Sequence, residues 1–156
     1  MLNLAQLTII SGGQTGVDRA ALDFALAHGI RHGGWCPRWR LADDGQIPER
    51  YNLIEHDSEG YSGRTLANVQ DADATLLVSR GKLTPGTKLT LKFARELGKP
   101  HFMLNLAEKM PWPKLVQGWI ETNAIHRLNV AGASEGKRPS IYSETMRLFE
   151  RIFSTD

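Results

Sequence analysis

Hydrophobic residues along the chain follow two alternating patterns, one of strand length and one of helical spacing. Short apolar or β-branched runs predict strands at residues 7–10, 74–78, 101–104 and 128–132, with weaker ones at 30–35 and 51–55. Apolar residues three and four positions apart predict helices around residues 20–26, 61–71, 89–97, 112–119 and 141–152. The chain therefore alternates strands with helices.

Strands that alternate with helices at this spacing are joined by right-handed crossovers and form a parallel sheet that is covered on both faces. We predict a single domain over residues 1–156 of class α/β, a Rossmann-like three-layer sandwich with a mainly parallel sheet. Residues 74–78 are apolar throughout, which indicates an interior strand. The stretch 36–50 contains two prolines and a glycine and is predicted to be a long, ordered loop.

Three strand-to-helix junctions contain glycine, at residues 12–16, 81–86 and 132–136. Parallel strands end at the same edge of the sheet, so we expect these junctions to share one cleft. The first junction, Gly-Gly-Gln-Thr-Gly, matches neither the dinucleotide fingerprint nor the ATP loop. Its glycines permit positive φ and would expose backbone N–H groups at a helix N-terminus, where anions bind. This chemistry favours phosphate as the ligand.

Two of these junction features also have a purely structural explanation. Asp18 is either a cap or first-turn acid of the helix, or a ligand contact. Residues 84–87, Thr-Pro-Gly-Thr, form either a Pro-Gly turn with a threonine cap or a second anion grip. Together with the first junction, the second reading predicts a phosphate held from two sides.

Charged side chains near the junctions are open to the same two readings. Arg38, Arg40 and Arg80 are either solvated or add charge-assisted hydrogen bonds to the anion. Asp43 and Asp44 suit either an Asp-Asp-Gly turn or the N–H and NH2 edge of a purine- or pterin-like ring.

Composition and charge narrow the function classes. The chain has 156 residues, 41% apolar and 23% charged, and a net charge of +2 from dispersed lysines and arginines, so no nucleic-acid partner is expected. No segment has membrane-spanning length, and the single cysteine, Cys36, fits a reducing compartment, so we expect a cytoplasmic protein. The five histidines lack metal-ligand spacing, and Cys36 lacks a nucleophile signature. We therefore expect no protein-held metal and no catalytic residue.

Five segments together resemble the family of molybdenum cofactor carrier proteins, and the resemblance covers nearly the whole chain. They are residues 11–23 (Ser-Gly-Gly-Gln-Thr-Gly-Val-Asp-Arg-Ala-Ala-Leu-Asp), 34–38 (Gly-Trp-Cys-Pro-Arg), 41–45 (Leu-Ala-Asp-Asp-Gly), 73–76 (Asp-Ala-Thr-Leu) and 128–132 (Leu-Asn-Val-Ala-Gly). Trp39 departs from the pattern, because this family has glycine there in a Pro-Arg-Gly-Arg version of the loop. A bulky side chain at this position would close or reshape the cleft.

The resemblance implies a Rossmann-like superfamily that also contains lysine-decarboxylase-like nucleotide phosphoribohydrolases. It implies the molybdenum cofactor, a pterin with a phosphate and a dithiolene-bound molybdenum oxoanion, as cargo, with molybdate or a nucleotide as alternatives. A molybdoenzyme would receive the cargo, and the superfamily and the tryptophans favour a homo-oligomer. The phosphoribohydrolases carry a Gly-Gly-x-Gly-Thr-x-x-Glu signature, and Thr90 stands where the glutamate would be. A binding protein is therefore favoured over a hydrolase, while a nucleotide-sensing module would share every phosphate feature.

The expected contacts to this cofactor come from the junctions and from the charged side chains around them. They are Gly12, Gly13, Gln14, Thr15, Gly16, Asp18, Arg19, Arg38, Asp44, Ser79, Arg80, Gly86, Thr87 and Asn129.

Overall fold

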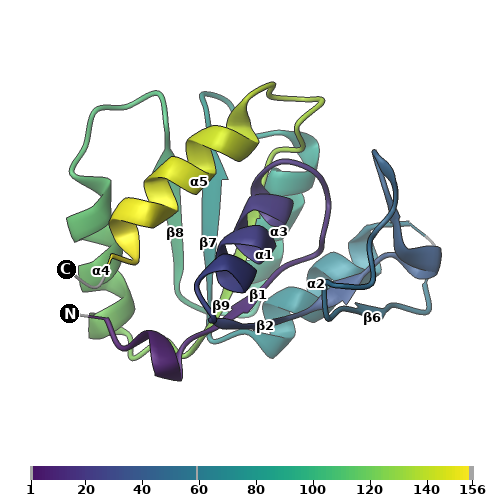
Figure 1. Cartoon of the computed structure of the whole chain (residues 1–156), viewed down its shortest axis with the longest axis horizontal. Helices are drawn as coiled ribbons and strands as arrows, with labels where there is room; N and C mark the ends of the chain where they lie inside the picture. The colour runs from purple at the N-terminus through teal and green to yellow at the C-terminus, as the bar shows by residue number, and fades with distance from the viewer. Residues whose placement is uncertain (1, 59, 155–156) are drawn as a thin grey trace.

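The computed structural model describes residues 2–58 and 60–154, and it confirms the predicted α/β architecture (Figure 1). A five-stranded sheet has the order β2-β1-β9-β7-β8, and every neighbouring pair in it is parallel. Its strands are β1 (Thr8–Ile10), β2 (Arg31–Gly33), β7 (Ala74–Ser79), β8 (His101–Asn105) and β9 (Arg127–Gly132). All six residues of β7 are buried, which confirms its prediction as an interior strand.

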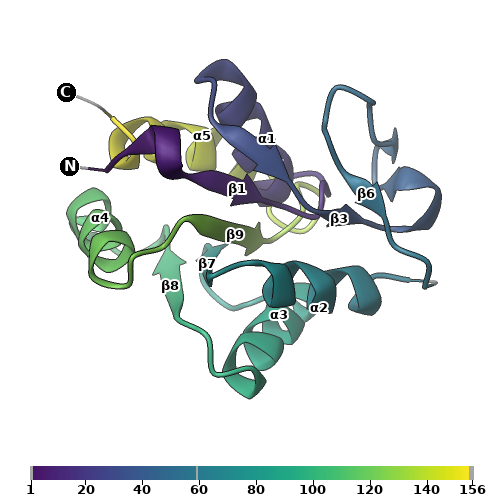
Figure 2. The same cartoon turned by 90° about the horizontal axis from the view of Figure 1, so that it is seen from below.

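Helices cover both faces of this sheet. They are α1 (Val17–Ala27), α2 (Ser62–Asp71), α3 (Pro85–Glu96), α4 (Trp112–Thr122) and α5 (Ile141–Ile152). Figure 2 shows α1 and α5 on one side of the sheet and α2 and α3 on the other. Helix α4 packs beside β8, where Phe102 meets the rings of Trp112 and Trp119 at centroid distances of 6.1 and 5.4 Å. These two tryptophans therefore pack within the chain.

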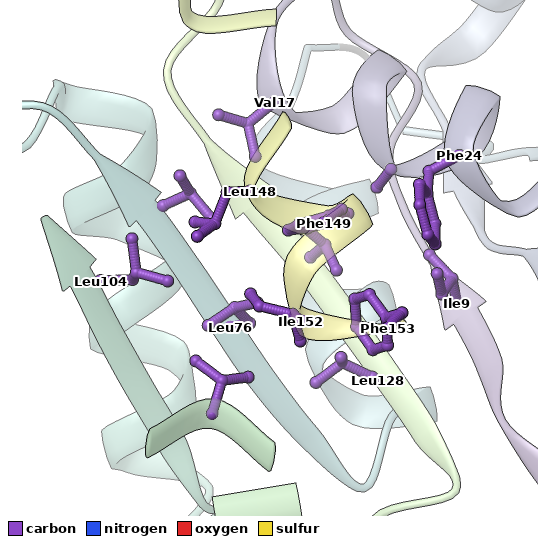
Figure 3. Close-up of a cluster of buried hydrophobic side chains, with 14 of the residues drawn as sticks. Ile9, Val17, Phe24, Leu76, Leu104, Leu128, Leu148, Phe149, Ile152 and Phe153 are labelled. Carbon is purple, nitrogen blue, oxygen red and sulfur yellow. The ribbon is translucent and has the colours of Figure 1, made fainter. Parts of the chain in front are cut away.

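The main hydrophobic core lies beneath α1 and α5 (Figure 3). Strand residues Ile9, Leu76 and Leu128 are fully buried there. Phe149 of α5 meets Phe24 of α1 edge to face, with ring centroids 5.8 Å apart. Burying apolar surface of this kind stabilises a fold by about 25 cal/mol per Å², so the stripe on α5 holds the helix in place over the strands.

The last strand of the chain, β9, is inserted in the middle of the sheet between β1 and β7. The chain leaves β1 toward one edge through α1 and β2, and leaves β7 toward the other edge through α3 and β8. The strand order therefore reverses beside β9. In open α/β sheets, a crevice forms at the carboxyl ends of the strands where the order reverses, and ligands bind in it.

The long segment between β2 and α2 forms an ordered arm beside the sheet (Figure 1). It contains the pair β3 (Trp35–Cys36) and β6 (Ile54–Glu55), the 3-10 turn Arg38–Arg40, and the hairpin β4 (Leu41–Ala42) with β5 (Gly45–Gln46). Arg40 organises the arm because its guanidinium donates to four backbone carbonyls, those of Ile47, Pro48, Tyr51 and Leu53. Cys36 is buried in the arm, and burial raises the pKa of its thiol.

The weaker predicted strands are shorter than expected. The run 30–35 breaks at Gly34, where φ is 134° and a Cβ would lie 2.2 Å from the Ser11 carbonyl oxygen. Only glycine fits this close approach of two backbones. The chain therefore leaves the main sheet after β2 and continues in the arm. The predicted strand 51–55 is reduced to the two residues of β6.

Candidate functional site

A cavity of about 390 Å³ opens at the carboxyl edge of the sheet, where the strand order reverses. All three glycine-bearing junctions contribute to its wall, which confirms that they share one cleft. Gln14 comes from the first junction, Pro85 and Gly86 from the second, and Gly132 and Ser134 from the third. Asp18, in the first turn of α1, and Lys137, just after the third junction, line the same cavity. Asp43, at the tip of the β4–β5 hairpin, lies at the same cavity.

Helix α2 supplies a wall of the cavity that sequence reasoning missed. Tyr61, Arg64 and Thr65, in and just before its first turn, line the cavity opposite the first junction. The helix itself was predicted correctly from its apolar residues, but those residues identify only the face that is buried. The polar residues of its first turn could have been predicted as site residues, because a helix N-terminus at this edge of the sheet points toward the ligand.

Arg64 and Asp18 form an ion pair inside this cavity. Arg64 Nη1 lies 3.6 Å from Asp18 Oδ2, and the two side chains are only 13% and 6% exposed. Within residues 2–58 and 60–154, Arg64 Nε is buried and has no hydrogen-bond partner. A buried donor without a partner costs about 1–3 kcal/mol. Arg64 therefore lines the cavity with a guanidinium whose donors are not all used within the described protein.

The Asp18 carboxyl group has an unusual proton affinity. Burial raises its pKa from 3.8 to about 6, against the opposing effects of the Arg64 guanidinium and of the Gln14 backbone N–H that donates to it. Burial disfavours the charged form of an acid, so the carboxylate depends on these two partners. Asp18 thus lies in the first turn of α1 and also lines the cavity, and its contact with a ligand stays a prediction.

Part of the backbone N–H set of the first junction is already bonded within the protein. Gly13 N–H donates to the Ser11 hydroxyl (3.2 Å), Thr15 N–H to the Gln14 side-chain oxygen (2.9 Å), and Val17 N–H, just after the junction, to the Ala133 carbonyl (3.1 Å). These three N–H groups are not available to a ligand in this conformation, and the anion grip by the backbone of this loop stays a prediction.

The glycines of the first junction serve close packing. A Cβ on Gly12 would lie 1.8 Å from Arg64 Nη1, so the absence of a side chain makes room for the guanidinium. Gly16 has φ of 84°, and a Cβ there would lie 2.3 Å from the Ala133 carbonyl oxygen. Gly13 also has a positive φ of 81°. These positions need glycine for steric reasons that do not involve a ligand.

Polar side chains of the first junction tie it to the hairpin of the arm. The Gln14 side chain accepts from the Asp43 N–H (2.8 Å) and donates to the Asp43 carboxylate (3.3 Å). Arg19 donates to both carboxylate oxygens of Asp44 (2.9 and 3.1 Å) and to the Gly13 carbonyl. The hydrogen bonds from Arg19 lower the pKa of Asp44. Arg19 and Asp44, both predicted as cofactor contacts, are each other's partners in this structure, and their contact with a cofactor stays a prediction.

The two other predicted arginines lie outside the cavity wall. Arg38 is in the 3-10 turn of the arm, with its guanidinium 5.3 Å from the centre of the Trp39 ring. Arg80 donates to Glu144 of α5 at 2.6 Å. Neither side chain is among those that line the cavity in the described part of the chain.

Three predicted polar contacts are buried and bonded within the fold. The Ser79 hydroxyl, at the end of β7, donates to a carbonyl of β8. Thr87 shares a hydrogen bond of 3.0 Å with the hydroxyl of Thr84 at the start of α3. Asn129 lies midway along β9, where its amide donates to the Thr75 hydroxyl at 3.3 Å. Of these, Thr87 lies nearest in sequence to the cavity wall at Gly86.

The N-terminus of α3 retains unpaired donors at the cavity. Thr84 caps the helix in an extended conformation and Pro85, which has no N–H, occupies its first turn. Among the described residues, the N–H groups of Gly86 and Thr87 donate to no protein acceptor, while Lys88 N–H donates to the Thr84 carbonyl. Free N–H groups and the helix dipole together attract anions. The second junction therefore has N–H groups available for an anion, and the binding itself stays a prediction.

Trp39 adopts the backbone conformation that glycine favours, with φ of 63° and ψ of 15°. This explains how glycine can occupy the position in the resembling family. Its side chain is 62% exposed and is not among the residues that line the cavity. The expectation that Trp39 closes or reshapes the cleft is therefore wrong.

No group of three or more potential metal-ligating side chains occurs within residues 2–58 and 60–154. No helix in the described chain is both long enough and apolar enough to cross a membrane. The fold and the cavity define an α/β protein with a pocket, lined by both charged and apolar residues, at the point where the strand order of its parallel sheet reverses.

Comparison with known proteins places the chain in a family. Residues 9–153 match the model of the circularly permutated YpsA SLOG family, and the chain belongs to that family. It is also similar to the crystal structure of a protein from Syntrophus aciditrophicus SB that is named as a candidate molybdenum carrier. The two are 45% identical over 96% of each chain, with a TM-score of 0.93. No curated protein matches the chain. The resemblance seen in the sequence is thereby confirmed.

Proposed function

We propose that this chain is a binding protein for a phosphate-bearing cofactor, which it holds at the carboxyl edge of its sheet. The observation that carries the proposal is Arg64, whose nearly buried side chain lines the cavity and whose Nε has no hydrogen-bond partner among the described residues. Gly86, at the N-terminus of α3, and Lys137 add further positive potential to the same wall. A charged donor set around a cavity is suited to an anionic group.

The cofactor that fits these features best is the molybdenum cofactor, carried as cargo, with molybdate or a nucleotide as alternatives. Its phosphate and its molybdenum oxoanion are both anionic, so Arg64 and the α3 N-terminus would each suit one end of it. Asp43, at the rim, would accept hydrogen bonds from the donor edge of the pterin. The name of the Syntrophus aciditrophicus protein supports a molybdenum-related cargo.

The chain would work in the cytoplasm as a homo-oligomer, and it would pass its cofactor to a molybdoenzyme. The single, buried Cys36 supports a reducing compartment. Exposed apolar side chains such as Met103 and Leu115, 48% and 39% exposed, are available for contacts between subunits.

Native mass spectrometry of the purified chain tests the binding proposal. The chain is mixed in turn with molybdenum cofactor, molybdate and a panel of nucleotides, and a mass increase equal to one ligand is expected for the cofactor. Arg64→Gln should reduce that binding at least tenfold. Arg95→Gln removes the same charge from the exposed last turn of α3 and should leave binding intact. Equal binding by the two variants would contradict the assignment of the site.

A second candidate function, hydrolysis of a nucleotide to release its base, has one observation in its favour. Thr90 replaces the glutamate expected in phosphoribohydrolases, but Asp18 lines the same cavity as Thr90 and supplies a carboxyl group from α1. Its pKa of about 6 is close to the range of useful acid and base catalysts. An assay for released base on each nucleotide that binds, repeated with Asp18→Asn, distinguishes this function from binding alone.

A further inference from the structure

Asp18 is an unexpected residue in a cavity suited to anions. Its carboxylate is 6% exposed, lines the cavity, and lies 3.6 Å from the guanidinium that would bind an anion. A negative charge at this place repels an anionic ligand. The pair does not fill a gap that the packing would otherwise leave, because glycine at position 12 is what makes room for the Arg64 guanidinium. We therefore expect the carboxylate to make a favourable contact with a ligand that offsets this repulsion.

The hydrogen bonds of Asp18 indicate which acceptor positions of its carboxylate are free for a ligand. An ionised carboxylate only accepts, and its two oxygens have about four acceptor positions. The Gln14 N–H and the Arg64 guanidinium are the donors that face it within the described chain. Acceptor capacity therefore remains on the cavity side, directly beside the place where Arg64 would hold an oxoanion.

The charges around Asp18 come from every element that packs against it. Arg64 faces it from α2 and Arg19 acts on it from α1, while Lys137 and Asp43 line the cavity from the β9–α5 loop and the hairpin. No histidine is among the described residues that line the cavity. Of the two described acidic residues that line the cavity, Asp18 is the one that lies beside Arg64, where it would meet a proton carried by an anion bound there.

We propose that Asp18 selects oxoanions that carry a proton, by accepting the O–H of a phosphate group bound at Arg64. This proposal rests on the proposed function, that the cavity binds an oxoanion. Hydrogen phosphate, or a phosphate monoester in its protonated form, donates its O–H to Asp18 and loses the repulsion. Sulfate has no proton at neutral pH, so neither it nor the carboxylate can donate a hydrogen bond, and the two negative groups repel each other. The cavity therefore distinguishes phosphate from sulfate although the two anions have nearly the same size and shape.

Protonation of Asp18 removes the discrimination against sulfate. Burial raises the pKa of this carboxyl group to about 6. Below that pH, Asp18 itself becomes a donor and no longer repels a fully ionised anion. Sulfate binding to the unmodified chain should therefore strengthen as the pH falls from 7.5 to 5.

Isothermal titration calorimetry with inorganic phosphate and with sulfate tests the proposal. At pH 7.5, the unmodified chain should bind phosphate at least tenfold more tightly than sulfate. Asp18→Asn keeps the shape of the side chain but can donate, so it should bring the two affinities within about threefold. Glu96→Gln removes the same charge from the exposed far end of α3 and should preserve the tenfold ratio. Circular dichroism checks that each variant is folded.

A measurement on the unmodified chain tests the proposal without relying on a variant. Its affinity for sulfate, titrated between pH 7.5 and 5, should rise at least fivefold, with a midpoint near pH 6. Equal affinities for phosphate and sulfate at pH 7.5, both lost in Arg64→Gln, would overturn the role of Asp18 and leave the proposed function standing. If neither anion nor a phosphate monoester binds the unmodified chain, the proposed function fails together with this inference.

Discussion

The guanidinium of Arg64 occupies the space that a side chain on Gly12 would fill. The two residues belong to different elements, α2 and the first junction, and a Cβ on Gly12 would lie 1.8 Å from Arg64 Nη1. The glycine that begins the Gly-Gly-Gln-Thr-Gly motif is therefore explained by a side chain far away in the sequence.

Gly12→Ala should push the Arg64 guanidinium away from Asp18. Because the pair is nearly buried, we expect a loss of about 1–3 kcal/mol in the free energy of unfolding, together with weaker phosphate binding. Urea denaturation measures the first and calorimetry the second. Gly118→Ala is the matched control: it lies in α4 with nothing within 4 Å of its Cβ position. Alanine there should stabilise the chain by about 0.5–1 kcal/mol.

Ionisation of Asp18 should make the chain less stable as the pH rises. Its pKa is about 6 in the folded chain and 3.8 in the reference state, so the folded chain holds the proton more tightly. The stabilisation is full below about pH 4 and is lost as the pH rises through 6, a change of about 3 kcal/mol. Urea denaturation at a series of pH values, compared with Asp18→Asn, isolates this contribution. A slope that is the same in both chains would contradict the raised pKa.

The Arg19–Asp44 pair should act with the opposite sign. Hydrogen bonds from Arg19 lower the pKa of Asp44, so its stabilisation is present above the ordinary pKa of aspartate and is lost as the pH falls through the lower value of the folded chain. The Asp44 side chain is 50% exposed. Asp44→Asn should therefore cost less than about 1 kcal/mol near pH 7. Thermal denaturation at pH 7 and pH 3 measures the difference, which should shrink at the lower pH.

Trp39→Gly should stabilise the chain, because Trp39 holds a φ of 63° while its side chain is mostly in solvent. Relief of this backbone strain should contribute about 0.5–1 kcal/mol. Trp39→Ala removes the same ring but keeps the strained φ, so it should give no such gain. Thermal denaturation of the two variants separates the backbone effect from the loss of the contact with Arg38. If alanine stabilises as much as glycine does, strain is not the cause.

The sequence by itself determined the elements and the family. The periodicity of apolar residues predicts β1, β7, β8 and β9 and all five helices, because each element must turn an apolar face to the core. Alternation of strands and helices then implies parallel pairing and a ligand site at the carboxyl edge. The motif around residues 11–19 was sufficient to indicate the family.

Only the tertiary structure decided how the site is built. Periodicity describes neighbours along one element, so it could not show that β9 lies between β1 and β7. It also could not show that Arg64 reaches Asp18, or that Arg19 is taken up by Asp44. These contacts join residues on separate elements, and their geometry depends on how the elements pack. Apolar patterns do not specify where the polar residues of a site lie, because their positions depend on how the elements pack.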